Sequence, residues 1–188
     1  ASAGLRLHGY ATIDGGRAAD ITLDAVRLPA DALLGTTAIG LAALARVIER
    51  ATLCVCAEAV GAMDALLGKT VEYTKTRRQF GVAIASFQAL QHRMAEMFIE
   101  LEQSRSILMM ALMAAEAGEV LTRPVSAAKS RIGRAMRRLG QEAIQLHGGI
   151  GVTDELDVGH YFKRLTAIET LFGNTDFHLQ RFGVSHDR

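Results

Sequence analysis

Residues 37–75 read TAIGLAALARVIERATLCVCAEAVGAMDALLGKTVEYTK. Apolar side chains recur along this stretch at the three- and four-residue spacing of one helix face. The members of this face are Leu41, Leu44, Ile48, Leu53, Cys56, Val60, Met63 and Leu67. The pattern predicts one long helix that ends near Phe80-Gly81 and has an unusually wide apolar face. A face wider than a single helix seam requires predicts further burial against other subunits.

The rest of the chain continues the helical pattern. A second helix is expected from Phe87 to Ala117 with Ser86 as its N-cap, and a third from Thr122 to Gly148-Gly149. Thr122 and Pro124 suit the cap and first-turn positions of that third helix. Thr153-Asp154-Glu155 opens a fourth helix that ends near Gly173, and a short fifth helix runs from Asn174 to Phe182. Long helices joined by short loops predict an all-α, up-and-down four-helix bundle.

The first 35 residues differ from the rest. Leu5–His8 and Ile21–Val26 alternate apolar and polar residues on either side of the turn Asp14-Gly15-Gly16, which predicts two strands. Two strands alone are marginally stable in water, so this short N-terminal β stub is expected to be the edge of a larger sheet. The predicted division is therefore residues 1–35, the end of a β-domain, and residues 36–188, the helical bundle.

Composition excludes several classes of protein. Of 188 residues, 49% are hydrophobic and the net charge is +1, which excludes a disordered chain and gives no strong attraction to nucleic acid or to a membrane surface. Glu58 and Asp64 interrupt the most apolar stretch, residues 51–67, so no membrane span is expected. Cys54 and Cys56 are expected to be buried reduced thiols, which suits a cytoplasmic protein.

Two further groups of side chains were candidates for binding. The six histidines have no metal-ligand spacing, so no metal site is expected. Arg131, Arg134 and Arg138 share a helix face, which favours a solvated surface over a phosphate-binding stripe. No aromatic residues interleave with these arginines, and this further disfavours nucleic acid.

Two loops carry more specific information. Arg77-Arg78-Gln79-Phe80-Gly81 joins guanidinium groups, an aromatic ring and a glycine turn where the first helix ends. Gln145-Leu146-His147-Gly148-Gly149-Ile150-Gly151 ends the third helix in a glycine cluster, where the backbone can approach a ligand closely. Taken alone, the second loop is equally well explained as a helix C-cap with a tight turn.

Together these loops, with Ser86-Phe87-Gln88 and Gln91-His92 between them, strongly resemble the acyl-CoA dehydrogenase family. The resemblance covers essentially the whole chain and implies the C-terminal helical domain preceded by the end of the middle β-domain. In that family the two loops reach across a dimer interface and hold the pyrophosphate and adenosine half of the neighbour's FAD. The resemblance places these roles on Arg77, Gln79, Phe80, Gln145, Gly148 and Gly149. It implies an FAD-dependent oxidation of an acyl-CoA thioester at Cα–Cβ.

The chain departs from the family at the catalytic base. The family's usual base is a glutamate in a Tyr-Glu-Gly-Thr segment, and Gly173 is taken to stand at that position. Some members carry the base on the first helix, and that position falls on Ala51. Glu49 and Glu169 are poor substitutes, because Glu49 lies about 200° around the helix from that face and Glu169 lies one turn before Gly173. No residue is therefore assigned as catalytic.

Three interpretations stay open. The chain is expected to belong to a non-catalytic subunit whose hetero-oligomeric partner supplies the glutamate, as for bulky substrates such as steroid side chains. Alternatively the base lies in the preceding part of a homo-oligomer, or this branch performs other acyl-CoA chemistry. A rival class is a helical assembly or binding module that has lost flavin.

Overall fold

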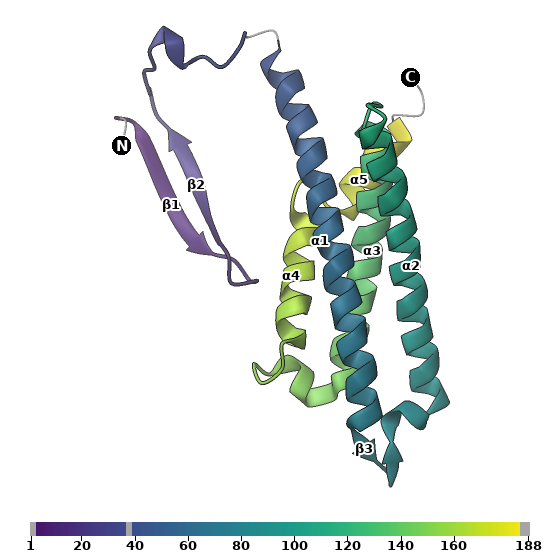
Figure 1. Ribbon diagram of the computed structural model, residues 1–188. Coiled ribbons are helices and arrows are strands. Elements are labelled where there is room, and N and C mark those ends of the chain that lie inside the picture. The colour runs from purple at the N-terminus through teal and green to yellow at the C-terminus, as the bar shows by residue number, and fades with distance from the viewer. Residues whose placement is uncertain (1–2, 37–38, 185–188) are drawn as a thin grey trace.

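The computed structural model describes residues 3–36 and 39–184. Five α-helices lie in it (Figure 1), and the predicted all-α bundle with an N-terminal hairpin is confirmed. The helices are α1 (Gly40–Thr76), α2 (Gln88–Glu116), α3 (Thr122–His147), α4 (Val158–Thr170) and α5 (Thr175–Val184). Residues 37–38, where the first helix was expected to begin, lie outside the described residues.

Helix α3 is the centre of the bundle, because it contacts each of the other four helices. Its apolar face is fully buried at Ile132, Ala135 and Leu139. Burying side chains of this size stabilises the fold by about 1.5–3 kcal/mol for each large one. From α1 the predicted residues Leu53, Cys56, Val60, Met63 and Leu67 join this core.

The first turns of α1 leave the predicted face uncovered. Leu41 is 80% exposed, Leu44 is 55% exposed and Ile48 is 38% exposed. On α2 the apolar side chains Met109, Met110 and Met113 are also about half exposed. The bundle's own core therefore does not account for all the apolar surface of its first two helices.

The hairpin stands beside the bundle (Figure 1). Strands β1 (Leu5–Ala11) and β2 (Arg17–Leu23) pair antiparallel, with Leu5 opposite Leu23 and Leu7 opposite Ile21. These four apolar side chains share one face of the hairpin, and three of them are more than 60% exposed. The prediction of a strand over residues 21–26 was wrong in its bounds, because β2 spans Arg17–Leu23 and the φ of +50° at Ala25 ends the extended run.

Three predicted helix starts need correction. Ser86 does not cap α2: its hydroxyl donates to the carbonyl of Ala83 at 2.8 Å, and Phe87 occupies the N-cap position without a side-chain bond. Thr122 is the first residue of α3 rather than its cap. The fourth helix begins at Val158 and not at Thr153, because the segment 148–152 forms a short 3-10 helix (η3) and residues 153–157 form turns.

By length and composition α1 passes the test for a helix that could cross a membrane, a test that the buried core helix of a bundle also passes, and part of its apolar surface lies in the bundle core. One prediction about α1 was wrong. Cys56 is buried as expected, but Cys54 is exposed, because the two side chains point to different sides of the helix. Burial raises the pKa of the Cys56 thiol to about 12, so this thiol is unreactive.

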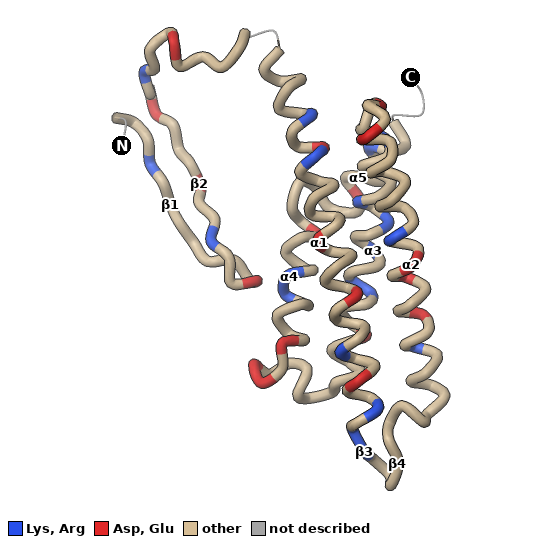
Figure 2. The backbone as a smooth tube through the Cα atoms, viewed as in Figure 1, with Lys and Arg blue, Asp and Glu red and all other residues tan. Residues whose placement is uncertain are grey.

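The arginine stripe of α3 is ion-paired. Arg131 binds Glu100 at 2.6 Å, and Arg138 binds Glu96 at 2.5 Å, so acids on α2 face the bases of α3 (Figure 2). The expectation of a purely solvated face was therefore wrong at these two positions. The Arg138–Glu96 pair is exposed and contributes at most about 1 kcal/mol, whereas the side chains of Arg131 and Glu100 are both mostly buried.

Candidate functional site

The first predicted loop is a tight hairpin at the end of α1. Arg77 leaves the helix in an extended conformation, and strands β3 (Arg78–Gln79) and β4 (Val82–Ala83) pair directly after it. The two residues between them, Phe80 and Gly81, have φ of +53° and +81°. Positive φ at both central residues defines a type I′ turn, the two-residue connection that matches the twist of paired strands.

Phe80 is the unusual member of this turn. A residue with a side chain in the left-handed region carries backbone strain on the order of 1–3 kcal/mol. Its ring is 90% exposed and touches only Phe87 edge-on, at a centroid distance of 6.1 Å. The hairpin therefore holds this aromatic ring out into solvent at the end of the bundle.

The second predicted loop follows α3. Gly148 has φ +66° and ψ −145°, a conformation that residues with side chains rarely adopt. Gln145, Gly148 and Gly149 are exposed, whereas Gly151 is buried. A Cβ atom at Gly151 would lie 2.9 Å from the carbonyl oxygen of Ile144, so that glycine permits the tight return of the chain.

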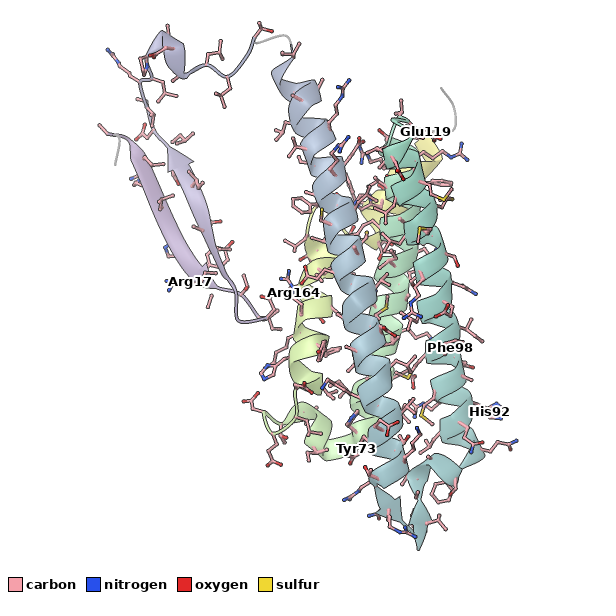
Figure 3. All side chains as sticks on the ribbon, viewed as in Figure 1. Arg17, Tyr73, His92, Phe98, Glu119 and Arg164 are labelled. Carbon is pink, nitrogen blue, oxygen red and sulfur yellow. The ribbon has the colours of Figure 1, made fainter. Side chains whose placement is uncertain are left out.

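The structure brings the two loops to the same end of the bundle. Tyr73, one turn before Arg77, donates its hydroxyl to the carbonyl of His147 at 3.2 Å. The rings of Tyr73 and His147 stack at 4.3 Å, and Gly148 follows directly. Tyr73 is labelled near this end of the bundle in Figure 3. The sequence analysis missed this pair, although Tyr73 lies one helical turn before the Arg77 loop and His147 lies within the second motif.

The segment between α4 and α5 holds the position assigned to the missing glutamate. Gly173 has φ +103°, and a Cβ atom there would lie 2.3 Å from Cδ1 of Phe177. No residue with a side chain fits this backbone. If the glycine of the family's Tyr-Glu-Gly-Thr segment is matched to Gly173 instead, the glutamate position falls on Phe172. Neither residue offers a carboxylate.

The two substitute carboxylates are engaged elsewhere. Glu49 is 7% exposed and accepts hydrogen bonds from the Thr122 hydroxyl and from Arg181, both at 2.7 Å. Glu169 accepts from the backbone N–H of Thr175 at 3.0 Å and pairs with Arg137 at 3.2 Å. Both side chains therefore join helices, and Ala51 offers no acid or base.

A buried ammonium group lies beneath the α4–α5 segment. Lys129 is 1% exposed, and its Nζ donates to the carbonyls of Ile168 at 3.0 Å, Glu169 at 2.9 Å and Gly173 at 2.8 Å. Burial lowers its pKa from the usual value. These bonds join Lys129 to the last turn of α4 and to Gly173 in the segment that follows it. The place of Lys129 on the same apolar face as Ile132 and Met136 was a sequence signal for its burial, although not for its acceptors.

His178 holds the same segment from α5. It is 1% exposed, and its Nε2 lies 3.0 Å from the carbonyl of Phe172, while Nδ1 lies 3.4 Å from the hydroxyl of Ser126. Nε2 is then the donor and Nδ1 the acceptor. Burial lowers the pKa of this imidazole, and the charges of Lys129 and Arg181 act in the same direction. Among the described residues, no three side chains of His, Cys, Asp or Glu converge as metal ligands.

Comparison with known proteins agrees with this arrangement. The family model for the acyl-CoA dehydrogenase C-terminal domain matches residues 39–183, a range that contains both loops, helices α1 to α4 and all of α5 except its last residue. The chain therefore belongs to the acyl-CoA dehydrogenase family, of which it contains the C-terminal helical domain.

Three relatives illustrate the similarity. The chain is 41% identical to acyl-CoA dehydrogenase IpdE2 of Mycobacterium tuberculosis over 120 residues, 63% of this chain and 36% of that protein. It is 30% identical to the probable acyl-CoA dehydrogenase YngJ of Bacillus subtilis over 173 residues, 92% of this chain and 45% of that protein. It also matches the crystal structure of the ChsE4–ChsE5 complex from Mycobacterium tuberculosis with a TM-score of 0.90 and 26% identity, covering 100% of this chain and 50% of that one. The chain thus spans less than half the length of the two relatives compared by sequence.

Proposed function

We propose that this chain is the C-terminal part of an FAD-dependent acyl-CoA dehydrogenase, which oxidises an acyl-CoA thioester at Cα–Cβ. The observation that carries the proposal is the pair of exposed loops, joined through Tyr73 and His147, in a chain of this family. Residues 1–35 would then be the end of a β-domain, and residues 36–188 the helical domain. The buried thiol of Cys56 suits a cytoplasmic location.

The residues of the two loops fit one half of a dinucleotide site. The Arg77 guanidinium, exposed at the end of α1, would fork onto a pyrophosphate, and the ring of Phe80 would pack on adenine. Gln79 and Gln145 would donate and accept hydrogen bonds, while Gly148 and Gly149 would let the backbone approach the phosphates. Because all six residues face outward, we propose that they hold the FAD of a neighbouring subunit.

When bound, FAD supplies the acceptor for the hydride that leaves Cβ. The proton at Cα needs a base, and this chain offers neither a carboxylate at Phe172 or Gly173 nor a free one at Glu49 or Glu169. We therefore propose that the base comes from a partner subunit of a hetero-oligomer. The similarity to a chain of the ChsE4–ChsE5 complex supports this arrangement over a homo-oligomer whose base lies in the preceding part.

The second candidate is a helical assembly module without flavin, which the apolar faces of α1 and α2 favour. Flavin absorbance of the purified full-length protein separates the two candidates. A colourless protein that cannot be reconstituted with FAD would leave only the assembly role.

The proposed site is tested by flavin content per subunit in the assembled full-length protein. Arg77→Ala removes a charge-assisted pair worth about 1.5–3 kcal/mol, so flavin affinity should fall roughly 10- to 100-fold. Arg77→Lys should recover only part of the loss, because an ammonium cannot reproduce the bidentate geometry.

Arg78→Ala is the matched control. Its guanidinium makes only a 3.4 Å bond to the carbonyl of Gly81, so flavin content should stay close to that of the unchanged protein. Equal flavin content in Arg77→Ala and in the unchanged protein would mean that the loop only ends the helix.

A further inference from the structure

The β hairpin reaches the helical bundle through its turn. Asp14 lies in the turn between β1 and β2, and its carboxylate accepts a bond from Nη1 of Arg164 on α4 at 2.6 Å. Figure 3 shows Arg164 on the side of α4 that faces the tip of the hairpin. Within residues 3–36 and 39–184, this is the only ion pair between the hairpin and the helices.

Both partners are held in place before they meet. Glu58 of α1 binds Arg164 in bidentate fashion, with Nε–Oε1 at 2.5 Å and Nη2–Oε2 at 2.8 Å, which leaves Nη1 free to point at the hairpin. The Asp14 carboxylate accepts the Thr12 hydroxyl as well, and its side chain is only 6% exposed. Hydrogen bonds from Thr12 and then from Arg164 lower the pKa of Asp14 to about 2, so it is charged at neutral pH.

Little apolar packing supports this junction. The hairpin turn, α1 and α4 line an open groove of about 470 Å³, and beyond Glu58 its α1 wall consists of the small residues Gly61, Ala62 and Ala65. Tyr161 of α4 lines the opposite wall. The segment that connects β2 to α1 is almost entirely exposed over residues 24–36, so it does not set the orientation of the hairpin.

We propose that Arg164 is an ionic clamp that fixes the β segment against the helical domain and keeps the hairpin turn at the edge of this groove. Glu58 orients the guanidinium of Arg164, and the Asp14 carboxylate accepts its remaining hydrogen bond. The clamp is a property of these three side chains and does not depend on flavin or on acyl-CoA.

The test is a distance measurement in the full-length protein. Spin labels at Arg17→Cys on the hairpin and His92→Cys on α2, in a background with the other exposed cysteines replaced, report the separation of the two parts by pulsed electron paramagnetic resonance. Both sites are exposed and lie on either side of the junction (Figure 3). We expect a narrow distance distribution in the otherwise unchanged protein.

Arg164→Met keeps the unbranched apolar stem and removes the guanidinium with its bonds to Asp14 and to Glu58. Losing the one charge-assisted bond between the hairpin and α4, taken at the low end because the guanidinium is partly exposed, should raise the population of displaced hairpin about 10-fold. Asp14→Asn should act in the same direction, and the double variant should release the hairpin no more than Arg164→Met alone, because both changes weaken the same bond between the hairpin and α4. Lys163→Met is the control, since Lys163 is adjacent on α4 and pairs only with Asp154 at 3.8 Å.

Circular dichroism distinguishes a released hairpin from a misfolded bundle. Released hairpin with unchanged helix content in Arg164→Met and Asp14→Asn, but not in Lys163→Met, supports the clamp. An unchanged distance distribution in Arg164→Met, or an equal broadening in Lys163→Met, would overturn it.

Discussion

Replacing Lys129 by methionine should destabilise the helical domain more than replacing any surface lysine. Lys129→Met preserves the apolar stem and approximate length of the side chain but removes the ammonium group. The carbonyls of Glu169 and Gly173 then lose the ammonium donor, and that of Ile168 keeps only the N–H of Leu171, in a place where the lysine is 1% exposed and water has little access. The consequence is a loosened C-terminus of α4.

The size of the effect follows from two opposing quantities. Three hydrogen bonds from a charged donor contribute about 1.5–3 kcal/mol each, and the desolvation of the ammonium opposes them by several kcal/mol. The net loss is therefore about 2–4 kcal/mol. For a protein of 150–250 residues, each kcal/mol corresponds to roughly 2–4 °C, so the melting temperature should fall on the order of 10 °C.

Urea and thermal unfolding, followed by circular dichroism, measure this loss. Lys163→Met is the matched control, and its exposed pair with Asp154 predicts a change below about 0.5 kcal/mol. Lys129→Arg should also destabilise, because a guanidinium is too large for a fully buried site. If Lys129→Met unfolds at the same urea concentration as the control, the three carbonyls do not depend on the ammonium and the reasoning fails.

Four further outcomes are expected. The pKa of His178 is lowered on folding, so the stability that its neutral form contributes is complete above the usual pKa of about 6.5 and is lost as the pH falls towards the lowered value. His178→Gln should therefore flatten this part of a curve of unfolding free energy against pH. His92→Gln, at an exposed position, is the control and should leave the curve unchanged. Gly173→Ala should lower the unfolding free energy by more than about 2 kcal/mol, because both the positive φ of Gly173 and the ring of Phe177 forbid a Cβ atom. Gly118→Ala is the control and should cost only about 1 kcal/mol, because Gly118 has φ +73° but open space around it. Phe80→Gly should raise the melting temperature by relieving about 1 kcal/mol of strain while lowering flavin content. Light scattering should find an assembly rather than a monomer, because the exposed apolar faces of α1 and α2 need cover, and a clean monomer at high micromolar concentration would contradict this.

Most of the fold could be predicted because helix periodicity is a local signal. The apolar spacing between Leu53 and Leu67 places that face in the core, and the helix ends at Gly118 and His147 follow from nearby glycines. The first residues of helices and strands were less predictable, because they depend on contacts between residues that are far apart in the sequence. Thr153 lies in a good capping sequence, yet the preceding 3-10 helix delays α4 to Val158.

The candidate site likewise contains residues that the sequence predicts and contacts that it does not. Arg77, Phe80 and Gly148 could be found from their motifs, because a glycine turn beside a guanidinium is visible in sequence. The contacts of Lys129 could not, since its acceptors are backbone carbonyls that lie 39 to 44 residues away. Backbone acceptors carry no residue identity, so no pattern of side chains reports them.

Two phenylalanines with a strained backbone differ in whether contacts within the domain offset that strain. Phe172 and Phe80 are both in the left-handed region, with φ of +57° and +53°. The carbonyl of Phe172 is bound by His178 and that of the next residue by Lys129, so bonds within the domain offset the strain there. Phe80 lies between the two-residue strands β3 and β4, makes one edge contact with the ring of Phe87, and is 90% exposed. The conformation of Phe80 costs free energy and gains little within the chain, and the exposed end of α3 at Gly148 lies at the same end of the bundle. This contrast supports the proposal that the two loops form half of a site that a neighbouring subunit and its ligand complete.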